Sequence, residues 1–309
     1  MKNPVVVLMG GFGNQLFQLA FALERYADQP FLLETSFGSP RIALNGKLDL
    51  QSYQLPPNVS VANLEAGRVT RKLLNLMLRI SISHANSKVK FGLIWVLSLL
   101  LKIVRMRNLT IVCGSEVGFS KINHPRSKKN DVVLGYFQSV RFLSEGTIEV
   151  LKNMDYTQRI DGFEKFKEMA SALKPIVVHV RLGDYELENG IGILTNTYYL
   201  EALEAAVRAY PESPIWIFSN DLPKTRERFS DFKFKNIHFV EDNWNSASAT
   251  FEVMRLGSAF VIANSSFSYW AAMLSKESNP LVIAPKPWFQ GTASPNAILP
   301  ENWMTVPTK

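Results

Sequence analysis

A histidine and an arginine stand two positions apart in a run of β-branched residues, Val177-Val178-His179-Val180-Arg181, and a turn with Gly183 and Asp184 follows. Side chains alternate between the faces of a strand, so we expect His179 and Arg181 to share one face. Ligands of open α/β sheets bind at the carboxyl ends of strands, and the arginine guanidinium matches a phosphate with two donors. The pattern predicts a strand end that binds phosphate; the alternative is an arginine paired with a nearby carboxylate.

A glycine-rich turn, Gly10-Gly11-Phe12-Gly13-Asn14-Gln15, stands between the first predicted strand and the first predicted helix. Glycines at such a turn let a ligand approach the backbone, and the helix N-terminus that follows favours an anion. The glycine spacing differs from that of the dinucleotide-binding fingerprint. Gly13 and Asn14 are therefore candidate ligand-binding residues, although a glycine turn at this position is common.

Two more polar clusters follow predicted strands. Asn220 and Asp221 have short polar side chains that suit ribose hydroxyls or base edges, whereas Pro223 shortly after them favours a plain helix cap. Ser265 and Ser266 offer hydroxyls together with the amides of a helix start, which is a phosphate-binding arrangement; capping by Ser266 is the structural alternative.

The elements that must position these clusters alternate regularly between strand and helix from residue 175 to residue 284. Residues 4–34 begin in the same way, and the pattern then weakens. A chain of 309 residues exceeds the usual size of one core. We predict an α/β protein with two Rossmann-like doubly wound domains facing a cleft, residues 1–160 and 161–309, with a boundary near 155–172 and a basic helical insertion at about 64–108 in the first.

Cysteine usage and the N-terminus predict a location. Cys113 is the only cysteine, so no intrachain disulfide can form, and the chain fits a reducing compartment. The apolar run Val5 to Met9 leads directly into the glycine turn, which is typical of a strand and not of an export signal. Neither Cys113 nor the four histidines show zinc-ligand spacing. The sequence predicts a cytoplasmic protein.

The net charge of +7 is concentrated in one segment. Between Ala66 and Ser115 there are nine basic residues and no Asp or Glu, interleaved with leucine-rich stretches. One interpretation is a helical subdomain with a solvated basic rim. The other is peripheral contact of residues 68–107 with an anionic membrane, at the inner face of the plasma membrane. Nucleic acid is not expected as a partner, because no helix-turn-helix, zinc-finger or RNA-recognition signature is present.

Three of these motifs together resemble the α-1,2-fucosyltransferase family, glycosyltransferase family 11. They are Gly-Gly-Phe-Gly-Asn-Gln from Gly10, His-Val-Arg-Leu-Gly-Asp-Tyr from His179 and Asn-Ser-Ser-Phe-Ser-Tyr-Trp-Ala-Ala from Asn264; the segments 135–139 and 192–194 are also similar. The resemblance implies a GT-B-like fold, GDP-L-fucose as donor, and inverting transfer to a sugar hydroxyl without a metal ion or other cofactor. The absence of any Asp-x-Asp pair from the chain agrees with the last point.

The resemblance also suggests roles for the candidate residues. The departing charge falls on the β-phosphate of GDP, where Arg181 would neutralise it with help from Asn14 and the amides of Ser266 and Phe267. The second domain would bind the nucleotide sugar and the first the acceptor. The other predicted donor contacts are His179, Gly13 and Ser265, with Asn220 and Asp221 at the ribose or guanine. Asp184 is expected to orient Arg181, and no general base is assigned.

Two positions depart from the family pattern. Many relatives have arginine where Leu182 stands, and many have aspartate where Thr250 stands; Glu252 is close but on another face of the predicted helix. We expect transfer of L-fucose to O2 of a terminal galactoside in a surface polysaccharide or lipid-linked oligosaccharide. The alternatives are a related transferase with another nucleotide sugar, and a nucleotide- or glycan-binding protein without turnover.

Overall fold

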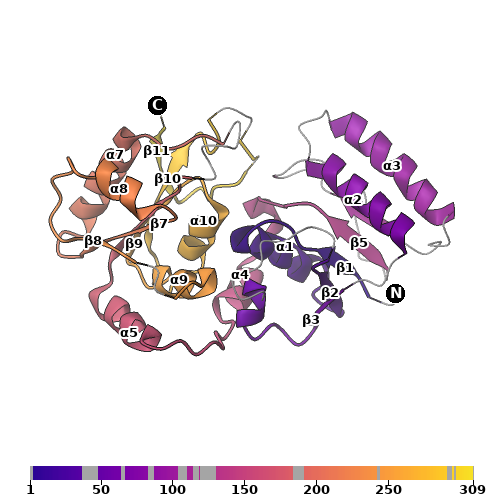
Figure 1. Ribbon diagram of the computed structural model, residues 1–309, viewed down its shortest axis with the longest axis horizontal. Helices are drawn as coiled ribbons and strands as arrows, with labels where there is room; N and C mark the ends of the chain where they lie inside the picture. Colours follow the sequence, from indigo (N-terminus) through magenta and orange to yellow (C-terminus); the bar gives the residue numbers. More distant parts are fainter. Residues whose placement is uncertain are drawn as a thin grey trace. The chain divides into compact units, whose positions relative to one another are not determined.

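The computed structural model describes residues 3–36, 48–63, 67–82, 87–103, 110–113, 118, 130–183, 191–241, 244–290, 294–295 and 297–308. These residues form two compact units (Figure 1). The first ends at Asp155 and also takes in Pro295 and Ile298; the second runs from Tyr156 to Ser294 and resumes at Leu299. Each unit is built on its own parallel sheet, and the predicted cleft between two domains stays a prediction.

The first unit contains a five-stranded sheet in the order β3-β2-β1-β5-β4, in which every neighbouring pair is parallel. Its strands are β1 (Val5–Val7), β2 (Phe31–Glu34), β3 (Val59–Ala62), β4 (Thr110–Cys113) and β5 (Asp131–Leu134). The central strands β1 and β5 are buried along their whole length, and both are apolar except for Asp131 at the start of β5. The strand order reverses between β1 and β5.

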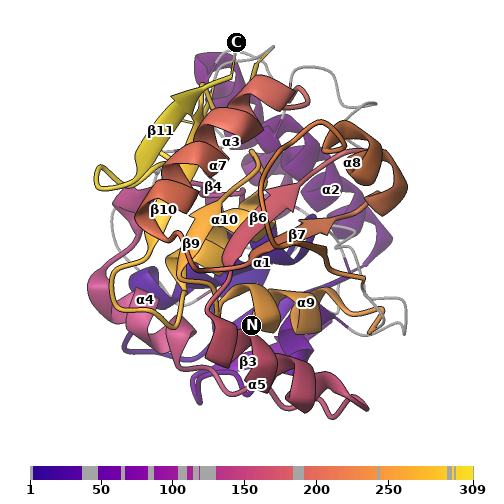
Figure 2. The same cartoon turned by 90° about the vertical axis from the view of Figure 1, so that its left-hand side faces the viewer.

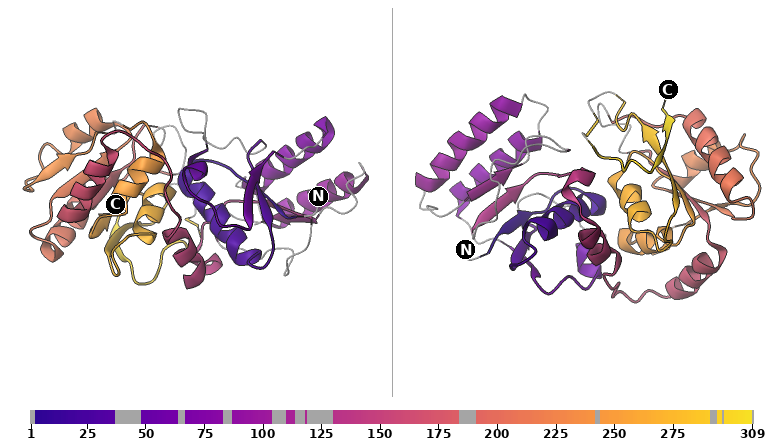
Figure 3. Two further views of the ribbon diagram at one scale, coloured as in Figure 1. Left: turned by 90° about the horizontal axis from the view of Figure 1, so that it is seen from below. Right: turned by 180° about the vertical axis from the view of Figure 1, so that it is seen from behind.

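Helices cover both faces of this sheet (Figure 3). They are α1 (Phe12–Arg25), α2 (Arg68–Ile82), α3 (Ser87–Ile103) and α4 (Glu145–Lys152), with the 3-10 turns η1 (Asp49–Ser52) and η2 (Val140–Phe142). Val5 and Val7 of β1 pack in one core with residues of α2 and α3, among them Leu74 and Leu97. Helix α1 lies on the opposite side of the sheet. The basic segment is therefore helical and forms one layer of the first unit.

The second unit contains a six-stranded parallel sheet in the order β11-β10-β9-β6-β7-β8. Its strands are β6 (Ile176–Val180), β7 (Ile215–Ser219), β8 (Ile237–Phe239), β9 (Ala259–Val261), β10 (Leu281–Lys286) and β11 (Met304–Pro307). Numbered within the unit this is 6-5-4-1-2-3, the doubly wound Rossmann order read from the other edge. Its switch point lies between β6 and β9, both near the centre of Figure 2.

The helices of the second unit are α5 (Phe163–Leu173), α7 (Asn196–Ala209), α8 (Leu222–Arg228), α9 (Ala247–Met254) and α10 (Ser266–Met273). The strand and helix alternation predicted from residue 175 onward is present in the structure. Helix α5 lies where the sequence suggested only a domain boundary, and it is anchored by the fully buried Phe163 and Ala170.

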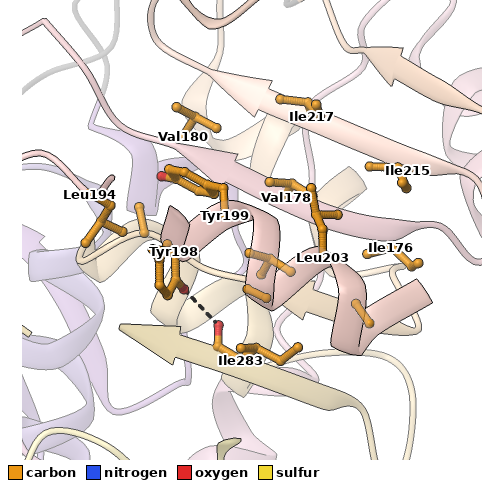
Figure 4. Close-up of a cluster of buried hydrophobic side chains, with 14 of the residues drawn as sticks. Ile176, Val178, Val180, Leu194, Tyr198, Tyr199, Leu203, Ile215, Ile217 and Ile283 are labelled. Atoms are coloured by element: carbon orange, nitrogen blue, oxygen red, sulfur yellow. Dashed lines mark hydrogen bonds between the residues drawn. The ribbon is translucent and has the colours of Figure 1, made fainter. Parts of the chain in front are cut away.

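One face of β6 is committed to the hydrophobic core (Figure 4). Val178 and Val180 lie in one cluster with Tyr198 and Tyr199 of α7. The Tyr198 hydroxyl donates to the carbonyls of Ile262, at 2.6 Å, and Ile283, at 3.2 Å, and complete burial raises the pKa of this phenol. Because strand side chains alternate, this core directs His179 to the other face of β6.

Candidate functional site

Two polar clusters of the second unit, at Arg181 and at Ser265, follow the strands that border the switch point of its sheet, and Asn220 follows the neighbouring strand β7. β6 pairs with β9 on one side and with β7 on the other. Arg181 follows β6 directly, and Ser265 follows β9 shortly before α10 begins at Ser266. Since ligands of doubly wound sheets bind outside the carboxyl ends of the strands at this point, the topology places a ligand site beside Arg181 and the start of α10.

His179 and Phe267, predicted from separate motifs, lie together. Their ring centroids are 5.8 Å apart, and His179 is 4% exposed. The His179 carbonyl accepts a hydrogen bond from the Tyr199 hydroxyl at 3.2 Å. On its other side, Phe267 meets Phe251 of α9 at 5.7 Å in an edge-to-face arrangement. In the sequence, nothing distinguishes Phe251 from an ordinary core residue, because it is an apolar residue in a predicted helix.

The side chains of Arg181 and Leu182, which follow β6, lie in different environments. Arg181 is partly exposed, whereas the Leu182 side chain is 2% exposed and packs in the core with Leu194 and Tyr198. Leu182, where the family resemblance led us to expect a second arginine, therefore packs in the hydrophobic core. Residues 181–183 are the described part of the loop that follows β6, and Arg181 is the cationic residue among them.

Asn220 holds this loop in place through two hydrogen bonds at 2.9 Å. Its Oδ1 accepts from the Leu182 amide and its Nδ2 donates to the Leu182 carbonyl. Gly183 has a φ of +62°, and a Cβ there would lie 3.2 Å from Asn220 Nδ2. Both facts favour glycine at this position. Asn220 therefore positions the backbone beside Arg181, and its predicted contact with ribose or guanine stays a prediction.

Replacing Asn220 with alanine is expected to weaken donor binding and to lower the free energy of unfolding by about 1 kcal/mol, because two partly exposed hydrogen bonds are lost. The matched control is Asn196→Ala. Asn196 also makes two hydrogen bonds through its amide, which join the start of α7 to Arg228 of α8: it accepts from Arg228 Nε at 2.9 Å and donates to the Arg228 carbonyl at 3.3 Å. Donor titration and denaturant unfolding of both variants test this; equal effects on donor affinity would contradict the positioning role.

Asp221 and Ser265 are helix caps in the structure. Asp221 Oδ1 accepts from the Lys224 amide at 3.2 Å at the start of α8, with Pro223 in the first turn. Ser265 Oγ accepts from the Phe267 amide at 3.4 Å at the start of α10. The alternative of a cap at Ser266 is wrong by one residue, because Ser265 has the extended backbone of a cap and Ser266 is already helical.

Thr250, the second position that departs from the family pattern, and the nearby Glu252 both make hydrogen bonds to other residues of the second unit. Thr250 Oγ1 donates to the Ser246 carbonyl at 3.1 Å. Glu252 Oε1 accepts from Arg255 Nη1 at 2.7 Å in a buried ion pair, and Arg255 Nε donates to the Leu274 carbonyl at 2.8 Å. This pair joins the end of α9 to the end of α10, whose start forms part of the candidate site.

The first unit has a polar cluster at its own switch point, between β1 and β5. Gly10 has a φ of +68°, and a Cβ there would lie 2.5 Å from Asn14 Nδ2. Asn14 Oδ1 accepts from Gln138 Nε2 at 2.8 Å, which joins the turn after β1 to the segment after β5. Gly13 is buried in the first turn of α1. The structure thus brings Asn14 beside Gln138, a residue that the similar segment 135–139 contained but that was not assigned a role.

Gln18, which was not among the predicted site residues, joins the same two strand ends. Its Oε1 accepts from the Met9 amide at 2.9 Å and its Nε2 donates to the Gly135 carbonyl at 3.1 Å. Gln18 is fully buried. An amide side chain at a buried helical position was the signal that could have found it, since buried polar groups are nearly always hydrogen-bonded.

Asp184 lies outside the described residues, so its predicted orienting role stays a prediction. Within the described ranges, no group of three or more His, Cys, Asp or Glu side chains is arranged to hold a metal ion. The described candidate residues form two sets. Gly13 and Asn14 lie in the first unit, and the second unit contains His179, Arg181, Asn220, Asp221, Ser265, Ser266 and Phe267.

Comparisons with known proteins bear on this geometry. Residues 5–306 match the family described as Glycosyl transferase family 11. The chain is 25% identical to an α-1,2-colitosyltransferase of Escherichia coli over 99% of both proteins. It is 24% identical to the O-antigen biosynthesis glycosyltransferase WbnK of Escherichia coli over 135 residues, 42% of this chain and 43% of the relative.

The fold is similar to that of a solved fucosyltransferase. The crystal structure of NodZ α-1,6-fucosyltransferase soaked with GDP-fucose, a protein known from Bradyrhizobium, matches with a TM-score of 0.50 and 14% identity over 91% of this chain and 97% of NodZ. The two parallel doubly wound sheets and this likeness confirm the predicted GT-B-like fold. Because the family match spans nearly the whole chain, the protein belongs to glycosyltransferase family 11 and is a glycosyltransferase.

Proposed function

We propose that this glycosyltransferase moves L-fucose from GDP-L-fucose, with inversion, to O2 of a terminal galactoside in a surface-polysaccharide or lipid-linked oligosaccharide acceptor. The observation that carries the proposal is the contact of His179 with Phe267 at the start of α10, at the switch point of the second sheet and two residues before Arg181. The α-1,2 linkage in the name of the colitosyltransferase and the O-antigen role in the name of WbnK support the linkage and the acceptor class.

In such a transfer the acceptor oxygen attacks the anomeric carbon on the face opposite the phosphate. The bond between that carbon and the β-phosphate oxygen breaks, and its electron pair leaves with GDP. Arg181 would neutralise the charge that grows on the β-phosphate, and the first amides of α10 would add oriented donors. Burial of His179 against Phe267 would keep water from one side of the donor. The acceptor hydroxyl loses its proton in the same step, and no residue is assigned as its base.

The second candidate is a related transferase whose donor carries colitose, which is L-fucose without the hydroxyl at carbon 3. The full-length similarity to a colitosyltransferase favours it. A site that hydrogen-bonds this hydroxyl would reject the deoxy sugar by about four orders of magnitude or more, whereas an apolar pocket would reject the extra hydroxyl by only about two. Non-catalytic binding, the third interpretation from the sequence, is set aside because the chain belongs to a glycosyltransferase family.

Transfer is expected with GDP-L-fucose, at a rate that EDTA does not change, because no Asp-x-Asp pair is present to hold a metal against the diphosphate. Purified protein is incubated with GDP-fucose, GDP-colitose, GDP-mannose or UDP-galactose. Each donor is tested with galactose-, N-acetylgalactosamine- and rhamnose-terminated acceptors, and GDP or UDP release and product are measured. A higher kcat/KM for GDP-colitose would favour the second candidate. Loss of transfer in EDTA that Mg²⁺ or Mn²⁺ restores would contradict the metal-independent reaction.

A further inference from the structure

The two helices α2 and α3, called here the basic hairpin, have one face in the core and one face in solvent. Their inner residues, among them Leu74, Met77, Ile94 and Leu97, pack against β1, β4 and β5. These contacts fix the orientation of both helices about their axes. Their outer faces are therefore defined by the fold, and the helices lie side by side in Figure 1.

The outer face of the basic hairpin is unusually apolar. Most of the large apolar side chains that are exposed in the described part of the chain lie on it: Val69, Leu76, Val89, Leu93, Trp95, Val96, Leu99 and Leu100. Trp95 is 64% exposed. Val89, Leu93, Val96 and Leu100 follow one another at helical spacing and form a continuous outer stripe of α3. Clustered exposed apolar side chains of this kind mark an interaction surface.

The outer face of α2 is basic. Arg68, Lys72 and Arg79 are exposed and share one side of the helix with Asn75, beside the exposed Val69 and Leu76. No acidic residue occurs from residue 66 to residue 115. A solvated basic rim, the first interpretation of this segment, does not account for the apolar stripe on α3. A cationic face next to an apolar one matches the boundary between anionic headgroups and acyl chains.

We propose that the outer face of the basic hairpin docks on an anionic lipid bilayer. The α3 stripe would enter the boundary of headgroups and acyl chains, and the basic side chains of α2 would contact the headgroups. Among the described residues no helix is long and apolar enough to cross a membrane. α3, with 17 residues, is about 25 Å long and would lie along the surface. This proposal is independent of which sugar the enzyme transfers, and it suits an acceptor that is itself held by a membrane.

The full-length protein is expected to float with vesicles that contain phosphatidylglycerol and to bind pure phosphatidylcholine vesicles much more weakly. Raised salt should weaken binding without abolishing it, because the apolar contact is not screened. The emission of Trp95 should shift to shorter wavelength when anionic vesicles are added, and Trp95→Phe should remove most of that shift while binding persists.

Two variants separate the charged from the apolar contribution. Arg68→Glu/Lys72→Glu/Arg79→Glu should reduce partitioning by more than about a hundredfold, since one basic residue near an anionic surface contributes about a fivefold factor. Leu93→Gln/Leu100→Gln should abolish the part of the vesicle binding that persists at raised salt. The matched controls are Lys165→Glu/Lys233→Glu/Lys235→Glu, which changes the net charge equally, and Met169→Gln/Leu173→Gln, which removes exposed apolar side chains of α5. Both controls should bind like the unaltered protein.

Three results would overturn the proposal: no flotation with anionic vesicles, equal loss in the control variants, or a dimer in sedimentation that the Leu93→Gln/Leu100→Gln variant disrupts and vesicles do not compete with. The last would mean that the stripe covers a second copy of the chain. Circular dichroism and transfer to a small soluble acceptor verify that each variant is folded, so that failure of docking is distinguishable from failure of the enzyme.

Discussion

The Arg181→Ala variant is expected to lose about two to three orders of magnitude in kcat, because one preorganised donor aimed at developing charge has that effect. Arg181 follows the buried strand β6, at the sheet position where doubly wound folds bind ligands, and Asn220 fixes the backbone next to it. The charge on the β-phosphate is larger in the transition state than in the bound donor. The loss should therefore be greater in kcat than in the dissociation constant of the intact donor, GDP-L-fucose.

Steady-state transfer, and titration with GDP-L-fucose in the absence of acceptor, measure the two effects separately. Arg181→Lys should recover part of the rate, since it restores the charge but not the two parallel hydrogen bonds. Arg208→Ala, which removes an exposed arginine of α7, is the matched control and should leave kcat unchanged. If Arg181→Ala lowered thermal stability while kcat fell less than about tenfold, the alternative of an arginine paired with a carboxylate would be favoured.

The Arg255→Met variant is expected to lower the free energy of unfolding by about 3–5 kcal/mol, because it leaves the buried Glu252 carboxylate without its ion-pair partner. Arg255 is 1% exposed, and the hydrogen bond from its Nε to the Leu274 carbonyl is lost as well. Denaturant unfolding followed by tryptophan fluorescence measures the change.

The double variant Glu252→Leu/Arg255→Met should be less destabilised than Arg255→Met, since removing both charges leaves no buried charge uncompensated. Arg226→Met is the matched control: it breaks the exposed ion pair between Arg226 and Glu241, which are 3.3 Å apart, and should cost less than about 1 kcal/mol. Similar losses in Arg226→Met and Arg255→Met would show that the α9–α10 pair is no more than a surface contact.

The sequence by itself determined the local structure and the family. Strand β7 is apolar up to its last residue and β6 is apolar except for His179, and the Thr195 cap of α7 lies where its residue type predicts it. These features depend on residues within a turn or two of one another, so spacing encodes them. The strands β3 and β11 were missed because they are half-exposed strands at sheet edges, where the apolar run is interrupted.

Only the tertiary structure decided which strand ends meet and what each polar side chain does there. The order of strands sets β6 beside β9, and long-range contacts join Asn14 to Gln138 and Asn220 to Leu182. The structure also shows that Leu182 belongs to the core and that Glu252 is held by Arg255. Such partners lie on different elements or depend on which face of a helix is buried, and packing of the whole unit settles both. No spacing along the chain encodes that packing.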